Sequence, residues 1–324
     1  NFTPPDERVE SRQKYCSIQS AKAIYLYGQG NYQASLTTLE SVRDEFYAME
    51  LTKTSDYAQN LYYQSLNYRA LHENDKSLDL IEKAIDILDE TDVSHSPIKL
   101  RAIVQLASML QRMERYDAAE DMINWIKELT RKHLSETHPI YIDALVQEAE
   151  LLTYKEELMK ADELYKNCIL LYSRLFSKSH QSILLTRQKL AISLIDQKQY
   201  SDAIRLLLEN IDAESTKTTV YSANAHYYIG EAACLVSETK EAKLYFQDAY
   251  KQFEILDIKP MLATIIYNLF DIACLEQDDE DILEMYTRYN KINESASNID
   301  KCQIHLDYGN YHFNQTSYEK AAQY

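Results

Sequence analysis

The chain has 324 residues, a formal net charge of −17, 45% hydrophobic residues and 26% charged residues, a composition that predicts a folded protein. Its 4 glycines and 5 prolines are too few for a many-stranded sandwich, and no glycine-rich loop of the nucleotide-binding kind is present. The excess of 51 acidic over 34 basic residues argues against nucleic acid and membrane partners, because lysine and arginine must neutralise the phosphates of both.

The sequence also carries information about location. No apolar run approaches the ~18 residues that a membrane-spanning helix needs. The five cysteines are far apart and form no C-x-x-C pair, which is typical of a reducing compartment, so we expect a cytoplasmic protein. The first residue, Asn1, is not methionine. We therefore expect the sequence to be part of a longer protein, with further domains beyond Tyr324.

A helical repeat occupies residues 15–324, after a stretch 1–14 that either extends the array or starts its first helix. In chain order, the predicted first helix of each repeat has a position for a small residue at Ala23, Ser65, Ala107, Ala149, Ala191, Gly230, Phe270 and Gly309, of which only Phe270 is large. Three residues later come Leu26, Tyr68, Leu110, Leu152, Leu194, Ala233, Ala273 and His312. The predicted second helix has a corresponding position at Ser35, Ser77, Ala119, Ala161, Ala203, Ala242, Ile282 and Ala321. The spacing is 42 residues in the first half and 39 or 40 later.

These spacings predict an all-α fold. Residues three apart share one helix face, and small residues there allow two helices to approach closely. Pro97, Pro139 and Pro260 fall ten residues before the small residue of a first helix, where proline suits a helix start. We predict a right-handed α-solenoid of about eight antiparallel helix pairs, with the last pair truncated at Tyr324.

Several segments resemble a known family. Arg115–Ala119 (RYDAA) and Gln199–Ile204 (QYSDAI) resemble tetratricopeptide repeats (TPRs), and the 42-residue period with Thr137–Pro139 (THP) resembles the kinesin-light-chain type. The shorter C-terminal spacing is loosely similar to the repeat domains of peptide-pheromone receptors of the Rap and PlcR type. The resemblance implies a superhelix that binds a peptide or protein segment in its concave groove. Kinesin-light-chain-type first helices carry asparagines that bind peptide backbone, and the matching positions here are Gln105, Gln147, Lys189, Tyr228 and Asn268.

We find no pattern of catalytic residues and expect no enzyme activity, no cofactor and no metal. His133 and His138 lie five residues apart in a predicted loop without a nearby cysteine, which is not a metal-ligand pattern. The acidic run from Glu276 to Asp281 lacks the glycine and the ligand spacing of a calcium loop, so it is read as a solvated helix start.

The candidate binding face consists of polar positions on the first helices. Arg101, Gln105, Ser108 and Arg112 follow one another at spacings of 4, 3 and 4, which places them on one helix face. An ordinary solvated face is the alternative interpretation. The candidate partner-binding residues are Arg69, Arg101, Gln105, Arg112, Gln147, Glu150, Asn224, Tyr227, Tyr228, Asn268 and Asp271. The arginines of this set would hold an anionic group, such as a peptide carboxylate.

Three functions fit these observations. The first is a non-enzymatic scaffold whose groove binds a segment of another protein. The second is a signalling-peptide receptor of the Rap or PlcR type that changes shape on binding. The third is the regulatory TPR arm of a larger enzyme or of a ubiquitin-ligase complex.

Overall fold

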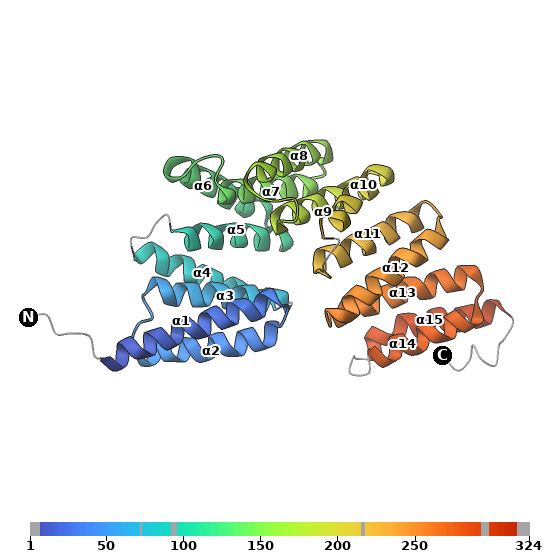
Figure 1. The fold of residues 1–324 in the computed structure, drawn as a ribbon, viewed down its shortest axis with the longest axis horizontal. Helices are drawn as coiled ribbons and strands as arrows, with labels where there is room; N and C mark the ends of the chain where they lie inside the picture. Colours follow the sequence, from blue (N-terminus) through green and yellow to red (C-terminus); the bar gives the residue numbers. More distant parts are fainter. Residues whose placement is uncertain (1–6, 72, 92–95, 215–217, 293–297, 316–324) are drawn as a thin grey trace, which may run out of the picture. The chain divides into compact units, whose positions relative to one another are not determined.

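The structure is a computed structural model that describes residues 7–71, 73–91, 96–214, 218–292 and 298–315. These residues form fifteen α-helices and no strand, which confirms the all-α prediction (Figure 1). The helices are α1 (Glu7–Gly28), α2 (Tyr32–Ala48), α3 (Ser55–Ala70), α4 (Asn74–Glu90), α5 (Pro97–Arg112), α6 (Tyr116–His133), α7 (Pro139–Tyr154), α8 (Leu158–Leu175), α9 (Gln181–Asp196), α10 (Tyr200–Ala213), α11 (Val220–Leu235), α12 (Thr239–Ile255), α13 (Lys259–Glu276), α14 (Asp279–Ile292) and α15 (Asn298–Asn314).

The chain divides into two compact units, Asn1–Tyr172 and Ser173–Tyr324, and α8 crosses the boundary between them. In each unit, successive helices run back and forth as antiparallel pairs, such as α3 with α4 and α11 with α12 (Figure 1). The odd-numbered helices are the first helices of the repeats. The second helix of the eighth repeat, with Ala321, lies outside the described residues.

The predicted small-residue positions lie where the two helices of a pair cross. Those of the second helices, from Ser35 to Ile282, are at most 1% exposed. In two repeats a side chain also joins the helices, because Ser35 Oγ donates to the Ala23 carbonyl and Ser77 Oγ donates to the Ser65 carbonyl, both at 2.8 Å. The predicted register is therefore confirmed.

The seventh repeat fills the same crossing with large side chains. Phe270 and Ile282 are 0% and 1% exposed and pack in one core cluster with Tyr286 and Tyr308. Tyr308 belongs to α15, and its ring stacks on that of Tyr286 of α14 with centroids 4.2 Å apart, so this contact joins the pair to the next helix. Phe270 and Ile282 thus fill a crossing that small residues occupy in the other repeats.

The turn inside each pair has one conformation throughout the described chain. A backbone N–H donates, at 2.8–3.1 Å, to the carbonyl five residues earlier, and the acceptors are Leu26, Tyr68, Leu110, Leu152, Leu194, Ala233 and Ala273. The residue before the donor has a positive φ, between 55° and 77°, at Gly30, Glu114, Glu156, Lys198, Ser237 and Gln277. This is the Schellman helix end. Only the first of these turns uses glycine, so the other five hold a residue with a side chain in the left-handed region.

The starts of the first helices are also regular. Side chains of Thr54, Ser96, His138, His180 and Thr219 accept a hydrogen bond from a backbone N–H of the first turn, at 3.2–3.3 Å. Pro97, Pro139 and Pro260 occupy the first or second position of α5, α7 and α13, as predicted. These caps satisfy N–H groups that have no partner within the helix.

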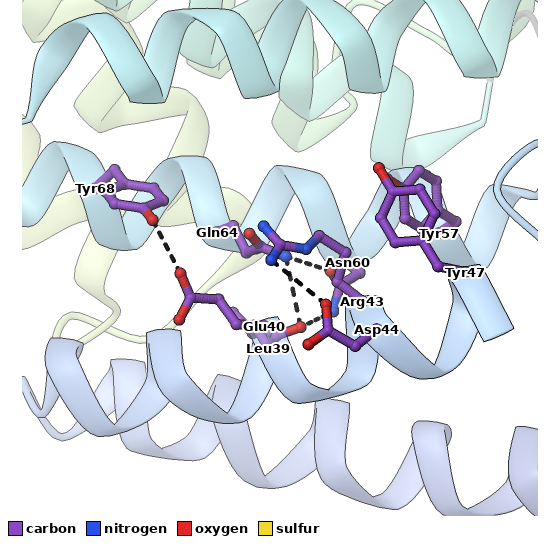
Figure 2. Close-up of polar contacts among 9 residues, drawn as sticks. All are labelled: Leu39, Glu40, Arg43, Asp44, Tyr47, Tyr57, Asn60, Gln64 and Tyr68. Atoms are coloured by element: carbon purple, nitrogen blue, oxygen red, sulfur yellow. Dashed lines mark hydrogen bonds and ion pairs between the residues drawn. The ribbon is translucent and has the colours of Figure 1, made fainter.

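A polar seam joins α2 to α3 (Figure 2). Asn60 Nδ2 donates to the Leu39 carbonyl at 3.0 Å, and Gln64 Nε2 donates to Asn60 Oδ1 at 2.6 Å (Figure 2). One turn further along α3, the Tyr68 hydroxyl donates to Glu40 Oε1 at 3.0 Å. The side chains of Asn60 and Tyr68 thus join α3 to α2.

Replacing Ala161 by arginine should lower the free energy of unfolding by at least about 3 kcal/mol, because an unpaired charge would enter a crossing that is 0% exposed. Chemical denaturation measures this change. Asn167→Arg, at an exposed position of the same helix, is the matched control and should change stability by less than about 0.5 kcal/mol. Equal effects of the two substitutions would contradict the register.

Substitutions in the left-handed turns should change the free energy of unfolding in opposite directions, depending on whether glycine is introduced or removed. Lys198→Gly should raise the free energy of unfolding by about 0.5–1 kcal/mol, because glycine adopts a positive φ without the steric penalty of a Cβ. Gly30→Ala should lower it by a similar amount, since the φ of Gly30 is 77°. Lys198→Ala keeps the Cβ and removes the charge, so a gain in its thermal midpoint would assign the effect to charge.

Candidate functional site

A cavity of about 410 Å³ opens in the second unit, on the face formed by its first helices α9, α11 and α13. Its volume lies within the range of ~300–1,000 Å³ that is typical of ligand pockets. The walls come from four helices: Ile195 of α9, Glu231, Cys234 and Leu235 of α11, Phe246 of α12, and Asn268, Asp271, Ile272 and Leu275 of α13. Two of the predicted site residues, Asn268 and Asp271, therefore lie in one cavity.

The back of this cavity depends on a glycine. Phe246 is 1% exposed and reaches the cavity from α12. A Cβ added to Gly230 would stand 2.8 Å from the Phe246 ring, so the glycine makes room for the aromatic ring. The small-residue position of the sixth repeat therefore also shapes the cavity.

The cavity is acidic. The Tyr227 hydroxyl donates a hydrogen bond to Glu231 Oε1. Burial raises the pKa of Glu231, the hydrogen bond from Tyr227 lowers it in part, and the nearby carboxylate of Asp196 raises it. Burial and the charge of Asp307 raise the pKa of Asp271 to about 6. No lysine or arginine contributes to either shift, so both carboxylates lie in an environment that disfavours their charged form.

The other predicted residues of α11 divide between core and surface. Asn224 is half-buried, and its Nδ2 donates to Gln188 Oε1 of α9 at 3.3 Å, which links two first helices. Tyr227 is 9% exposed, and its ring lies 5.9 Å from that of Phe246. Tyr228 is half-buried. Tyr227 therefore belongs mainly to the core, and only its hydroxyl serves the acidic cavity.

In the first unit, Arg69 and Arg101 lie near one tyrosine and Arg112 lies near another. Burial raises the pKa of the Tyr62 phenol, and the guanidinium groups of Arg101 and Arg69 both oppose this shift. Arg112 acts in the same way on Tyr154 of α7. Arg101 and Arg112 lie on the second and last turns of α5, and eleven residues span about 16 Å of helix. One extended ligand fits this spacing better than one small anion.

The amides between these arginines are mostly covered. Gln105 and Gln147 are 6% and 9% exposed, and Ser108 is 9% exposed, so the expected polar line on α5 is exposed only at its two ends. Gln105 Nε2 and Gln147 Oε1 have no hydrogen-bond partner among the described residues. Glu150 is half-buried and its charge acts on Tyr154. The first unit thus exposes Arg101 and Arg112 on α5, whereas the polar side chains between them on this helix are largely covered.

Sequence reasoning missed the apolar part of the cavity. Leu235 and Leu275 are 58% and 73% exposed and end α11 and α13. Each follows a cavity carboxylate by four residues, Glu231 and Asp271, and therefore shares its helix face. This repeated acid-to-leucine spacing was the available signal, but leucine in a repeat is ordinarily a core residue.

The remaining chemical candidates have structural roles. The acidic run contributes ion pairs from Glu276 and Asp281 to Lys243, at 2.8 and 2.7 Å, and Asp278 accepts from two N–H groups of α14. His138 caps α7. Within the ranges that the structure describes, no three His, Cys, Asp or Glu side chains converge as a metal site, and no helix is long and apolar enough to cross a membrane.

Comparison with known proteins supports the fold. No protein-family model and no curated protein matches the sequence. Among solved structures, the apo form of the quorum sensor NprR from B. thuringiensis is 14% identical with a TM-score of 0.66, covering 98% of this chain and 89% of that chain. NprR in complex with its cognate peptide NprX is 12% identical with a TM-score of 0.61, covering 87% and 79%. A Rap protein complexed with Competence and Sporulation Factor is 13% identical with a TM-score of 0.58, covering 86% and 80%.

At this level of identity the likeness establishes the fold alone. The chain is an all-α protein of TPR-like helix pairs, and the resemblance to Rap-type repeat domains is confirmed as a resemblance of fold. The roles of individual residues in those proteins cannot be assigned to this chain, because the positions that proteins of this fold share are packing positions.

Asp271→Asn should raise the thermal midpoint at pH 7.5, and the gain should shrink as the pH falls from 6 towards 4. The folded-state pKa of about 6 lies above the ordinary value of 3.8, so ionisation of Asp271 opposes folding above pH 6 and has no such effect once both states are protonated. Asp212→Asn, at an exposed position of α10, is the control and should show no such pH dependence. A gain that is equal at both pH values would contradict the assignment.

Proposed function

We propose that this protein is a non-enzymatic interaction module that binds a peptide, or an extended segment of another protein, on the face formed by its first helices. The observation that carries this proposal is the cavity of the second unit, where Asn268, Asp271 and Glu231 are combined with exposed leucines. A binding pocket combines apolar walls with a few polar groups in the same way.

The first unit offers a separate candidate contact region of its own. Arg101 and Arg112 are exposed on the second and last turns of α5, and the largely covered side chains of Gln105 and Ser108 lie between them along the helix. Charge-assisted bonds from arginine would select acidic residues or a terminal carboxylate.

A signalling-peptide receptor is the second candidate function. The observation in its favour is that two of the solved structures with this fold, those of NprR and of Rap, are described as complexes with a peptide or with a named factor. A receptor would bind a short free peptide as tightly as the protein from which it derives, whereas a scaffold would need the longer segment. Calorimetry with both ligand forms separates the two functions.

The Arg101→Ala, Arg112→Ala double variant should weaken binding at least about tenfold, since each charge-assisted contact in a partly desolvated groove contributes about 2 kcal/mol. Ligands are obtained by mass spectrometry of peptides that co-purify with the native protein and by selection from a displayed library of random peptides. Calorimetry then compares the wild-type chain with the double variant.

Lys166→Ala is the matched control, because Lys166 is exposed on the second helix α8. It should leave affinity unchanged. If no peptide is selected, the proposed function fails. If peptides bind both forms equally, the arginines have no role in binding.

A further inference from the structure

The cavity of the second unit presents two kinds of surface in the same order on two helices. Glu231 precedes Leu235 by four residues on α11, and Asp271 precedes Leu275 by four residues on α13. Both α11 and α13 pack against α12, and Phe246 of α12 closes the cavity between them. A ligand group that enters the cavity therefore meets aliphatic side chains at one level and carboxylates one helix turn away.

These carboxylates differ from other acidic groups of the chain. By contrast, Glu148 is paired with Lys127 at 2.7 Å, and Glu276 and Asp281 are both paired with Lys243. The pKa of Glu231 and of Asp271 is raised without any contribution from a basic group. The charges of Asp196 of α9 and Asp307 of α15 raise these two pKa values, whereas the hydrogen bond from the Tyr227 hydroxyl lowers the pKa of Glu231. The cavity thus concentrates negative charge that the described residues leave without a counterion.

We infer that this cavity binds the side chain of a lysine or arginine of the bound peptide, with the aliphatic stem against Leu235 and Leu275 and the cationic head between Glu231 and Asp271. These two side chains are the natural residues that combine a long apolar stem with a positive head. The inference rests on the proposed function, and it specifies that the bound peptide contains a lysine or an arginine.

The arrangement favours a basic side chain over the other cations that acidic sites bind. A metal ion needs several ligands converging on one point, and no such group of three occurs among the described residues. The exposed leucines also have no atom that could bind a metal ion. An organic cation benefits from both surfaces, because burying its stem is favourable and its charge restores the ionised form of two partly desolvated carboxylates.

The test is a double-mutant cycle on the full chain. Random peptides displayed in a library are selected on the wild-type protein, and calorimetry measures each peptide and its analogue in which one lysine is replaced by norleucine or one arginine by citrulline. We expect a lysine or arginine at a constant position, and we expect its neutral analogue to bind at least about tenfold more weakly. In the Glu231→Gln, Asp271→Asn variant, the original peptide should lose the same factor, and the neutral analogue should lose nothing further.

Two controls exclude unfolding and general charge effects. The Glu241→Gln, Asp248→Asn variant removes the same charge from exposed positions of α12 and should bind the peptide like the wild type. Cys234, an exposed thiol on the cavity wall, reports occupancy directly. Bound peptide should slow its alkylation by iodoacetamide, as mapped by mass spectrometry.

The outcomes separate the two proposals. Selected peptides without a constant basic residue, or with equal losses in the cavity variant and in the α12 control, overturn the inference and leave the proposed function standing. If no peptide is selected at all, both proposals fall. A coupled loss together with protection of Cys234 supports both.

Discussion

The close approach of two helices at one residue of each pair is the constraint on which the rest of the structure depends. Where both residues are small, as with Ala23 and Ser35, the backbones come near enough for a side-chain hydroxyl to reach the opposite carbonyl at 2.8 Å. In the sixth repeat the first helix carries Gly230, and the second helix carries Phe246 one turn after its own small residue, Ala242. The Phe246 ring occupies the space that a side chain at Gly230 would need. The same packing rule thus produces both a closed crossing and the back wall of a cavity.

The parts of the fold that could be predicted from the sequence are those with a local or periodic cause. Proline at a helix start and a small residue at a crossing act through sterics that the neighbouring residues already determine. The seventh repeat shows the limit of this reasoning, because Phe270 breaks the small-residue rule and the pair still forms by packing aromatic rings. Its place in the array came from spacing alone.

The candidate site was predicted less completely, because a helical period assigns a face only to within one residue. Tyr227 and Tyr228 are adjacent, yet Tyr227 is buried in the core and Tyr228 is only half-buried. Gln105 and Ser108 are likewise covered, although Arg101 and Arg112 at the two ends of the same predicted line are exposed. Which side of a first helix stays open depends on how closely the next first helix packs, and no residue pattern within one repeat contains that information.

The left-handed turn residues have a consequence for how the array holds together. Glu114, Glu156, Lys198, Ser237 and Gln277 each make their own helical hairpin less favourable in isolation, since a residue with a Cβ resists this conformation. A lone hairpin is weakened while its contacts with the next repeat are unaffected. In the nearest-neighbour description of repeat proteins, this shifts stability from the intrinsic term of each repeat to the interfacial coupling. Such an array unfolds in larger cooperative blocks, and partly frayed states that would expose single hairpins are correspondingly rare.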